Sequence, residues 1–252
     1  MTISAIVPAA GCGARAALNG NKILAPLHDI VPWGEYSVLF WTLNALRAAS
    51  YPGAELLEII VVARKEEFEA IEKVWSECGF SLWHWTVEGG ATRQDSVLAG
   101  VQKAQGDWVL VHDAARPCVS GDVISRTVEA AQKTGGAIAA LPVSDTVKRA
   151  SGENFIEETL NRNEIWLAQT PQVFRRDLFL AALQSARIEG FEGTDCASIM
   201  ERAGHKVALA EGNINNLKVT YAADLERAAA ILKAGLGGYY SIFPSHNPHR
   251  KS

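Results

Sequence analysis

The sequence predicts an α/β fold built on a mostly parallel β-sheet. Over most of its 252 residues, short apolar runs alternate with stretches whose apolar residues recur at helical spacing. One of these runs, residues 56–63, is rich in Leu, Ile and Val, as is typical of a strand buried on both faces of a parallel sheet. Polar clusters follow several of the predicted strands, and such sheets bind ligands at the carboxyl ends of their strands. Repeated β-α units also imply right-handed crossovers between parallel strands.

The first half of the chain alternates strands and helices without interruption. The first strand is predicted to end by Pro8, which lacks a backbone N–H donor. Ser37 is predicted to cap the start of the first helix, and Gly79 to end the second. In chain order the predicted elements are a strand at 5–7, a helix at 37–49, a strand at 56–63, a helix at 66–78, a strand at 82–87, a helix at 94–103 and a strand at 108–111.

In the second half of the chain, the alternation of predicted strands and helices is interrupted once. Residues 142–171 break into short alternating pieces and are predicted to form a β-rich arm that leaves the main sheet. Around this predicted arm lie a helix at 122–133, a strand at 137–141, helices at 175–189 and 195–203, a strand at 206–209 and a helix at 222–233. Residues 1–236 are therefore expected to form one domain. The tail at 237–252 has no hydrophobic period and is expected to be mobile.

Composition excludes several classes of protein. With 48% hydrophobic residues, the chain can bury a full core and is not a disordered protein. Its net charge of −4 argues against a nucleic-acid partner or an anionic membrane surface, both of which need a basic field. The four cysteines, Cys12, Cys78, Cys118 and Cys196, contain no C-x-x-C pair, so neither a zinc site nor a disulfide framework is indicated. We expect reduced thiols, no membrane span and a cytoplasmic protein.

The loop after the first strand has the composition of a phosphate-binding loop. Four positions carry almost no side chain, so that phosphates can approach the backbone N–H groups: Ala9, Ala10, Gly11 and Gly13. Arg15 and Lys22 follow, and their charges can neutralise a polyphosphate. The same composition also fits an ordinary strand-to-helix turn whose cations face water.

Four further regions carry polar clusters. Residues 89–96 place a flexible turn, a cation and a hydroxyl at a predicted helix start, where an anion or a base edge could bind. In residues 112–117, Asp113 follows a strand, and one carboxylate with substrate phosphates is a common way to hold Mg²⁺. Residues 145–149 and 216–220 add polar groups. Each cluster taken alone also fits a helix cap, a local ion pair or solvated surface.

A dinucleotide-binding oxidoreductase is an alternative. The pattern Gly11-x-Gly13-x-x-Ala16 after a strand fits a relaxed fingerprint of that class. The fingerprint needs an acidic residue at the end of the next strand, but that strand ends in Ala63-Arg64-Lys65. Glu35 lies in a turn instead. The oxidoreductase reading is therefore disfavoured.

Five motifs, taken together and in order, resemble the 2-C-methyl-D-erythritol 4-phosphate cytidylyltransferase family. They are Pro8-Ala9-Ala10-Gly11-x-Gly13, Val111-His112-Asp113-Ala114-Ala115-Arg116-Pro117, Pro142-Val143-x-Asp145-Thr146-x-Lys148-Arg149, Gln169-Thr170-Pro171-Gln172 and Asn216-Leu217-Lys218-Val219-Thr220. The resemblance covers about residues 3–235. It implies a Rossmann-like nucleotidyltransferase domain with a mostly parallel twisted sheet and a protruding β-arm, exchanged between the subunits of a homodimer.

The resemblance also implies the reaction and the residues that carry it. CMP would pass from CTP to 2-C-methyl-D-erythritol 4-phosphate in non-mevalonate isoprenoid biosynthesis, with Mg²⁺ as cofactor and pyrophosphate as the second product. Arg15 and Lys22 would stabilise the transition state, and Arg162 and Lys218 would position the methylerythritol phosphate. The implied contacts to nucleotide, substrate and metal are Pro8, Ala9, Ala10, Gly11, Gly13, Gly90, Arg93, Ser96, Asp113, Ala114, Arg116, Thr146 and Thr170, with Asp113 also serving the metal and His112 structural.

The residue types suit this chemistry without help from the family. A phosphomonoester is already an anionic nucleophile, so cations and a metal are needed rather than a general base. The chain departs from the family pattern at Ala14, Asn21, Ala91 and Asn215, and residues 32–36 resemble a small insertion. Two alternatives remain: a ribitol-5-phosphate cytidylyltransferase, and a regulator that binds nucleotide without turnover.

Overall fold

The computed structural model describes residues 1–11, 21–28 and 35–235. Gly13, Arg15, most of the 32–36 insertion and the tail at 237–252 lie outside the described residues. Among the described helices, none combines the length and the apolar character that crossing a membrane requires.

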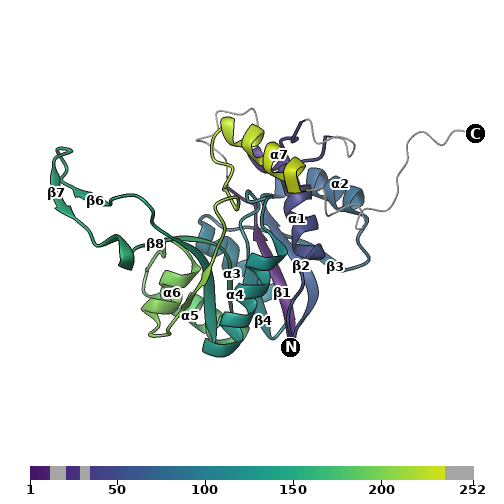
Figure 1. Cartoon of the computed structure of the whole chain (residues 1–252). Coiled ribbons are helices and arrows are strands. Elements are labelled where there is room, and N and C mark those ends of the chain that lie inside the picture. The colour runs from purple at the N-terminus through teal and green to yellow at the C-terminus, as the bar shows by residue number, and fades with distance from the viewer. Residues whose placement is uncertain (12–20, 29–34, 236–252) are drawn as a thin grey trace, which may run out of the picture.

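A seven-stranded sheet forms the centre of the molecule (Figure 1). Its strands lie in the order β3 (Trp83–Glu88), β2 (Glu55–Ala63), β1 (Thr2–Pro8), β4 (Trp108–Val111), β8 (Trp166–Arg175), β5 (Gly136–Pro142) and β9 (Ala208–Glu211). All neighbours pair in parallel except β8, which is antiparallel to both β4 and β5. The predicted α/β class with a mostly parallel sheet is therefore confirmed.

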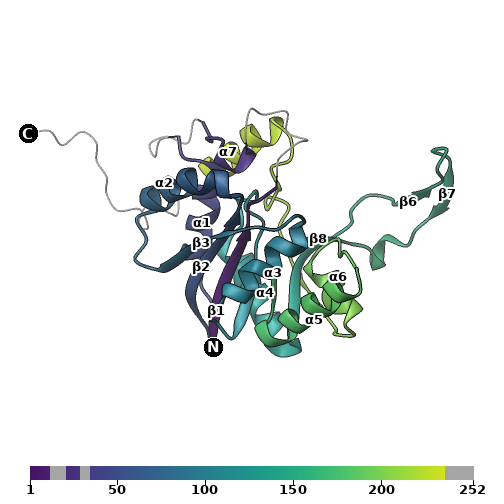
Figure 2. The same cartoon turned by 180° about the vertical axis from the view of Figure 1, so that it is seen from behind.

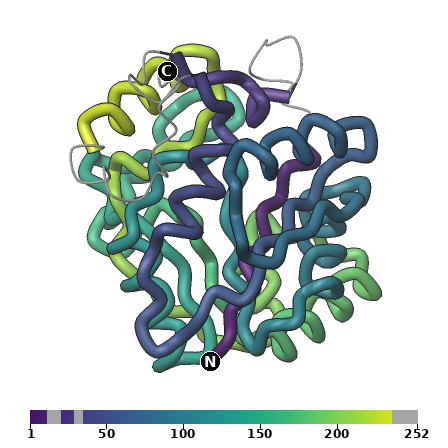
Figure 3. Tube along the Cα trace, turned by 90° about the vertical axis from the view of Figure 1, so that its right-hand side faces the viewer, coloured from purple at the N-terminus to yellow at the C-terminus, as the bar shows by residue number. Residues whose placement is uncertain are grey.

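Helices cover both faces of the sheet because the strands bury residues on both sides. In β1, Ile3, Ala5 and Val7 belong to one buried cluster and Ile6 to the other. The first cluster packs under α1 (Val38–Ala48), α2 (Phe68–Cys78), α4 (Gly121–Thr134) and α7 (Ala223–Gly235). The second packs under α3 (Arg93–Lys103), α5 (Arg176–Ile188) and α6 (Cys196–Arg202), which Figure 2 shows from behind. Figure 3 gives the view turned by 90°, with β1 in purple running through the middle.

Local sequence signals set the helix ends. The Ser37 hydroxyl accepts a hydrogen bond from the Phe40 N–H at 3.2 Å, as the predicted N-cap should. Gly79 ends α2 in the left-handed region at φ 59°, where a side chain would be strained. Among the described residues, longer elements are joined by three short 3-10 turns, η2 (Lys22–Leu24), η3 (Lys65–Glu67) and η4 (Arg162–Glu164).

The predicted arm needs a correction at its C-terminal end. Strands β6 (Lys148–Ala150) and β7 (Ile156–Thr159) pair in a separate hairpin that projects from the body (Figure 1). Residues 166–171, however, belong to β8 and lie within the central sheet. The sequence concealed this strand because polar residues, among them Gln169, Thr170 and Gln172, are buried in it. We use the name hairpin arm for residues 143–165.

Candidate active site

Two pockets open at the carboxyl ends of the parallel strands. The first, of about 590 Å³, lies beside the turn after β1 and the start of α3, and we call it the loop pocket. The predicted site residues that line it are Pro8, Ala9, Ala10, Gly11, Lys22, Gly90, Arg93, Ser96, Asp113, Ala114 and Lys218. Segments separated by two hundred residues thus meet in one cavity, as the position of the motifs predicted.

The α3 side of the loop pocket is a fixed turn followed by a capped helix. A Cβ atom on Gly90 would lie 2.2 Å from the Asp95 Cβ, so this position needs glycine. The Gly90 N–H donates to the Ser96 hydroxyl at 3.2 Å, and this hydroxyl lies 3.0 Å from the Thr92 carbonyl, to which it donates. Thr92 and Asp95 form a capping box. The N-terminus of α3 is therefore held at the pocket, where its dipole favours an anion.

Asn21 fastens the segment that carries Lys22. Its amide donates to the Ala9 carbonyl and to the Glu67 carboxylate, each at 3.0 Å, and its side-chain oxygen accepts from the Ile23 N–H at 3.3 Å. The side chain is nearly buried, at 8% exposure. The sequence marks Asn21 only as a departure from the family pattern and does not reveal this role. The one signal in the sequence was its position directly before a predicted site lysine.

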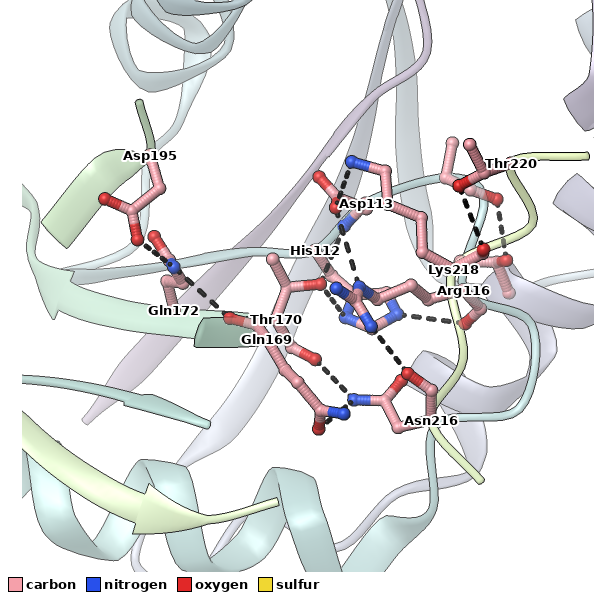
Figure 4. A network of polar contacts seen from close by, with 12 residues as sticks. His112, Asp113, Arg116, Gln169, Thr170, Gln172, Asp195, Asn216, Lys218 and Thr220 are labelled. Atoms are coloured by element: carbon pink, nitrogen blue, oxygen red, sulfur yellow. Dashed lines mark hydrogen bonds and ion pairs between the residues drawn. The ribbon is translucent and has the colours of Figure 1, made fainter. Parts of the chain in front are cut away.

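Three cationic side chains surround the Asp113 carboxylate, and Figure 4 labels two of them, Arg116 and Lys218. The Asp113 carboxylate lies 2.9 Å from the Lys218 ammonium, 3.2 Å from the Arg93 guanidinium and 3.6 Å from the Arg116 Nε. We call these four residues the charge cluster. Burial alone would raise the pKa of Asp113, but Lys218, Arg93 and Arg116 hold that pKa well below its usual range. Three cations against one ionised carboxylate leave a net positive charge that suits phosphate groups.

The second pocket, of about 560 Å³, lies between β8 and α6, and we call it the strand pocket. It shares Arg93, Asp113 and Lys218 with the loop pocket. Its wall also contains the predicted residues Arg116 and Thr170. Two molecules bound in the two pockets would therefore face the same cations.

Gln172 fixes the far side of the strand pocket. Its side chain is 1% exposed; its amide donates to the Asp195 carboxylate at 2.8 Å, and its oxygen accepts from the Cys196 N–H at 3.0 Å. These contacts tie β8 to the start of α6. This wall of the strand pocket is therefore formed where β8 is hydrogen-bonded to the start of α6. The sequence did not reveal the contact, because a glutamine is usually a surface residue.

His112 is structural in the sense predicted, since its ring is buried and hydrogen-bonded. The ring contacts the Arg116 carbonyl at 3.1 Å and the Thr170 hydroxyl at 3.0 Å. Burial lowers the pKa of His112 to about 4, so the ring is neutral at physiological pH.

Two predicted residues lie away from both pockets of their own chain. Thr146 and Arg162 belong to the hairpin arm, and neither lines the loop pocket or the strand pocket. The Arg162 guanidinium donates to the Ser144 carbonyl at 2.7 Å, within the arm itself. Gly13 and Arg15, which were expected at the nucleotide, lie outside the described residues.

A divalent cation could take one protein ligand here. Asp113 is the only carboxylate among the described residues that line the loop pocket. Across the described parts of the chain, no three His, Cys, Asp or Glu side chains gather in a group that could hold a metal by themselves. Mg²⁺ commonly binds one or two carboxylates and takes its other ligands from substrate phosphates and water. The donor set fits that mode.

Comparison with known proteins gives one consistent result. The family model described as 2-C-methyl-D-erythritol 4-phosphate cytidylyltransferase matches residues 3–234. A protein of that name from Acidobacterium capsulatum is 41% identical over 239 residues, covering 92% of this chain and 98% of the relative. The crystal structure of the 4-diphosphocytidyl-2C-methyl-D-erythritol synthase from Anaerococcus prevotii matches with a TM-score of 0.76 and 29% identity, over 92% and 98% of the two chains. The crystal structure of the cytidylyltransferase from Thermus thermophilus matches with a TM-score of 0.69 and 32% sequence identity, and the match covers 90% of this chain and 98% of the other.

Proposed function

The chain belongs to the 2-C-methyl-D-erythritol 4-phosphate cytidylyltransferase family, and we propose that its two joined pockets bind the two substrates of that reaction side by side. The enzyme transfers CMP from CTP to 2-C-methyl-D-erythritol 4-phosphate and releases pyrophosphate, a nucleotidyl transfer in isoprenoid biosynthesis. The family assignment disfavours both the oxidoreductase and the ribitol phosphate alternatives.

One observation carries the assignment of the pockets: both are lined by Arg93, Asp113 and Lys218. The loop pocket has the small residues that let a triphosphate approach the backbone, so it takes CTP. The strand pocket takes the polyol phosphate. The attacking phosphate oxygen and the α-phosphorus of CTP then meet at the charge cluster.

The chemistry requires positioning rather than a base. Both reactants are anions, and the obstacle is to bring their negative charges together. Lys218 and Arg93 can neutralise part of that charge, and Lys22 reaches the same cavity from η2. Arg15 is proposed to act beside Lys22. Mg²⁺, held by triphosphate oxygens and Asp113, would neutralise further phosphate charge when bound.

We also propose a homodimer in which each hairpin arm completes the site of the other subunit. Thr146 and Arg162 belong to the arm and line neither pocket of their own chain, which supports a role at a site on a neighbouring subunit. A C2 dimer provides such a surface twice. We place the enzyme in the cytoplasm, in keeping with the free thiols of Cys78, Cys118 and Cys196.

Pyrophosphate release tests the function directly. The protein is expected to release pyrophosphate from CTP only when both Mg²⁺ and 2-C-methyl-D-erythritol 4-phosphate are present. If ribitol 5-phosphate supported pyrophosphate release at an equal or higher rate, the polyol substrate would instead be assigned as ribitol 5-phosphate. Tight binding of CTP without any turnover would support a regulator instead.

A further inference from the structure

The site contains a buried chain of hydrogen bonds that the proposed reaction does not use. The His112 imidazole is fully buried, at 0% exposure, directly after β4. Its Nε2 lies 3.1 Å from the Arg116 carbonyl oxygen, and its Nδ1 lies 3.0 Å from the Thr170 hydroxyl. The same hydroxyl lies 3.1 Å from the Asp113 backbone nitrogen. Figure 4 shows that this chain joins the turn after β4 to β8.

Chemistry fixes the direction of each hydrogen bond. A carbonyl oxygen can only accept, so the His112 Nε2 carries a proton and donates to the Arg116 carbonyl. In a neutral imidazole the other nitrogen is then an acceptor, and the Thr170 hydroxyl must donate to it. The Asp113 N–H can only donate, and a lone pair of the Thr170 oxygen accepts it. The single proton of the Thr170 hydroxyl is therefore engaged within the protein.

Both ends of this chain belong to residues of the charge cluster. It holds the backbone N–H of Asp113 at one end and the carbonyl of Arg116 at the other. The Arg116 N–H donates to the Asp113 carbonyl at 3.0 Å and closes the turn between them. A small shift of this turn would move the carboxylate that collects the three cations.

The chain also reaches the loop that carries Lys218. The backbone carbonyl of Thr170 accepts a hydrogen bond from the Asn216 amide at 2.8 Å. Asn216 is fully buried, and it precedes Lys218 by two residues. Thr170 is therefore attached through its hydroxyl to Asp113 and through its carbonyl to the Lys218 loop. The two partners of the 2.9 Å ion pair share one anchor.

We propose that His112 is a positioning residue for nucleotidyl transfer: through Thr170 it fixes the turn from Asp113 to Arg116, and with it the carboxylate that aligns Lys218. This role rests on the proposed function of the site. It also assigns Thr170 a different part from the ligand contact expected of it. Its hydroxyl offers a bound ligand only an acceptor, and its effect on turnover passes through Asp113.

Removing either member of the chain tests the proposal. Thr170→Val and His112→Leu each delete one hydrogen-bonding partner while keeping similar bulk. Loss of groups that orient site residues elsewhere costs about 10-fold to 100-fold, so we expect kcat to fall by about that much with little change in the KM for CTP. Because the two residues act in one chain, the double variant should fall little further than either single one. Thr170→Ser should restore most of the rate.

A buried threonine outside the site provides the matched control. Thr127 in α4 is fully buried, and its hydroxyl donates to the Val123 carbonyl at 2.7 Å. Thr127→Val should lose a comparable hydrogen bond and keep the wild-type kcat. A folded His112→Leu or Thr170→Val protein with wild-type kcat would overturn the proposal. So would a kcat loss in Thr127→Val as large as that in Thr170→Val.

A measurement on the unaltered protein keeps the proposal testable even if these variants fail to fold. NMR of the imidazole nitrogens of His112 should show the neutral ring with the proton on Nε2, both with and without CTP. A proton on Nδ1, or on both nitrogens, at neutral pH would overturn it. If the wild-type protein releases no pyrophosphate from CTP and the polyol phosphate, the proposed function fails, while the NMR result still reports on the hydrogen-bond chain.

Discussion

The charge cluster and the hairpin arm are built in opposite ways. The cluster draws its four charges from three segments of the body, and its Asp113 side chain is 11% exposed. In the arm, every residue of β6 and β7 is exposed, and the apolar side chains of Phe155 and Ile156 are about 70% and 66% exposed. The difference shows that one chain preorganises the cations by itself. Exposed apolar side chains often mark an interaction surface, so we expect the arm to pack against another surface.

Lys22 is the sharpest test of the body's half of the site. Lys22 lines the loop pocket, where its charge can act on negative charge that grows in the transition state. Removal of one such preorganised donor costs on the order of 10²–10³ in turnover, so Lys22→Ala is expected to lose about that much in kcat while the fold is kept. Steady-state pyrophosphate release, with circular dichroism to check folding, measures this.

Lys73 offers a matched control because its side chain is 80% exposed on α2, outside both pockets. Lys73→Ala should keep the wild-type kcat. If Lys22→Ala changed only the KM for CTP, Lys22 would bind ground-state nucleotide without acting in the transition state.

Complementation tests whether the arm serves a second subunit. If each site combines Lys22 of one subunit with Arg162 of the other, inactive Lys22→Ala and Arg162→Ala proteins should restore activity when co-expressed. Random assortment makes about half of the dimers mixed, and each mixed dimer has one intact site, so activity should reach roughly a quarter of wild type. Differential tags confirm the mixed dimers. If these showed no more activity than the two parents, the site would be confined to one chain, or Arg162 would not belong to it.

The sequence predicted the body of the molecule well because its signals there are local. Ser37 and Gly79 mark helix ends by their own chemistry, and the run at 56–63 shows its burial by composition. The loop, the Asp113 turn and the Lys218 loop were each recognised by motif, and the parallel topology then brought them to one edge. Motif and topology together were sufficient for the charge cluster.

Tertiary hydrogen bonds account for what the sequence missed. Asn21 and Gln172 are polar residues of the kind usually found at the surface, and Thr170 was expected only as a ligand contact. The hydrogen-bonding partners of all three lie in other elements. Strand β8 was hidden for the same reason, because its polar residues are satisfied by α6 and by the Lys218 loop rather than by water. No local pattern reports a partner that is dozens of residues away.

The buried ring of His112 predicts a pH effect that the exposed arm cannot give. Burial lowers the pKa of His112 from 6.5 to about 4. Between pH 6.5 and about pH 4, His112 is protonated in the unfolded chain but stays neutral in the folded chain. The folded state therefore loses stability as the pH falls through this range. Between about pH 7.5 and about pH 5, the free energy of unfolding of the wild type should therefore fall by about 2 kcal/mol more than that of His112→Asn. Urea unfolding of both proteins at both pH values measures it. An equal loss in the two proteins would show that His112 does not titrate in this way.

The smallest effect is expected in the arm. Arg149 and Glu158 pair across β6 and β7 at 2.7 Å, with side chains 60% and 51% exposed. Exposed ion pairs contribute about 0–1 kcal/mol, because water screens the charges and two long side chains must be ordered. Arg149→Ala should therefore change the free energy of unfolding by less than about 1 kcal/mol.

Asn216→Ala provides the contrast in the body. It removes a buried donor and leaves the Thr170 carbonyl without the hydrogen bond that Asn216 gives it, which costs about 1–3 kcal/mol. Urea unfolding of both variants at matched protein concentration makes the comparison. A loss above about 2 kcal/mol in Arg149→Ala would mean that the pair is covered in the assembled protein. Repeating the measurement at lower protein concentration then separates two causes. If the loss in the free energy of unfolding shrinks as the protein dissociates, the pair lies in the dimer contact. If the loss does not depend on concentration, the pair packs against the body of its own chain.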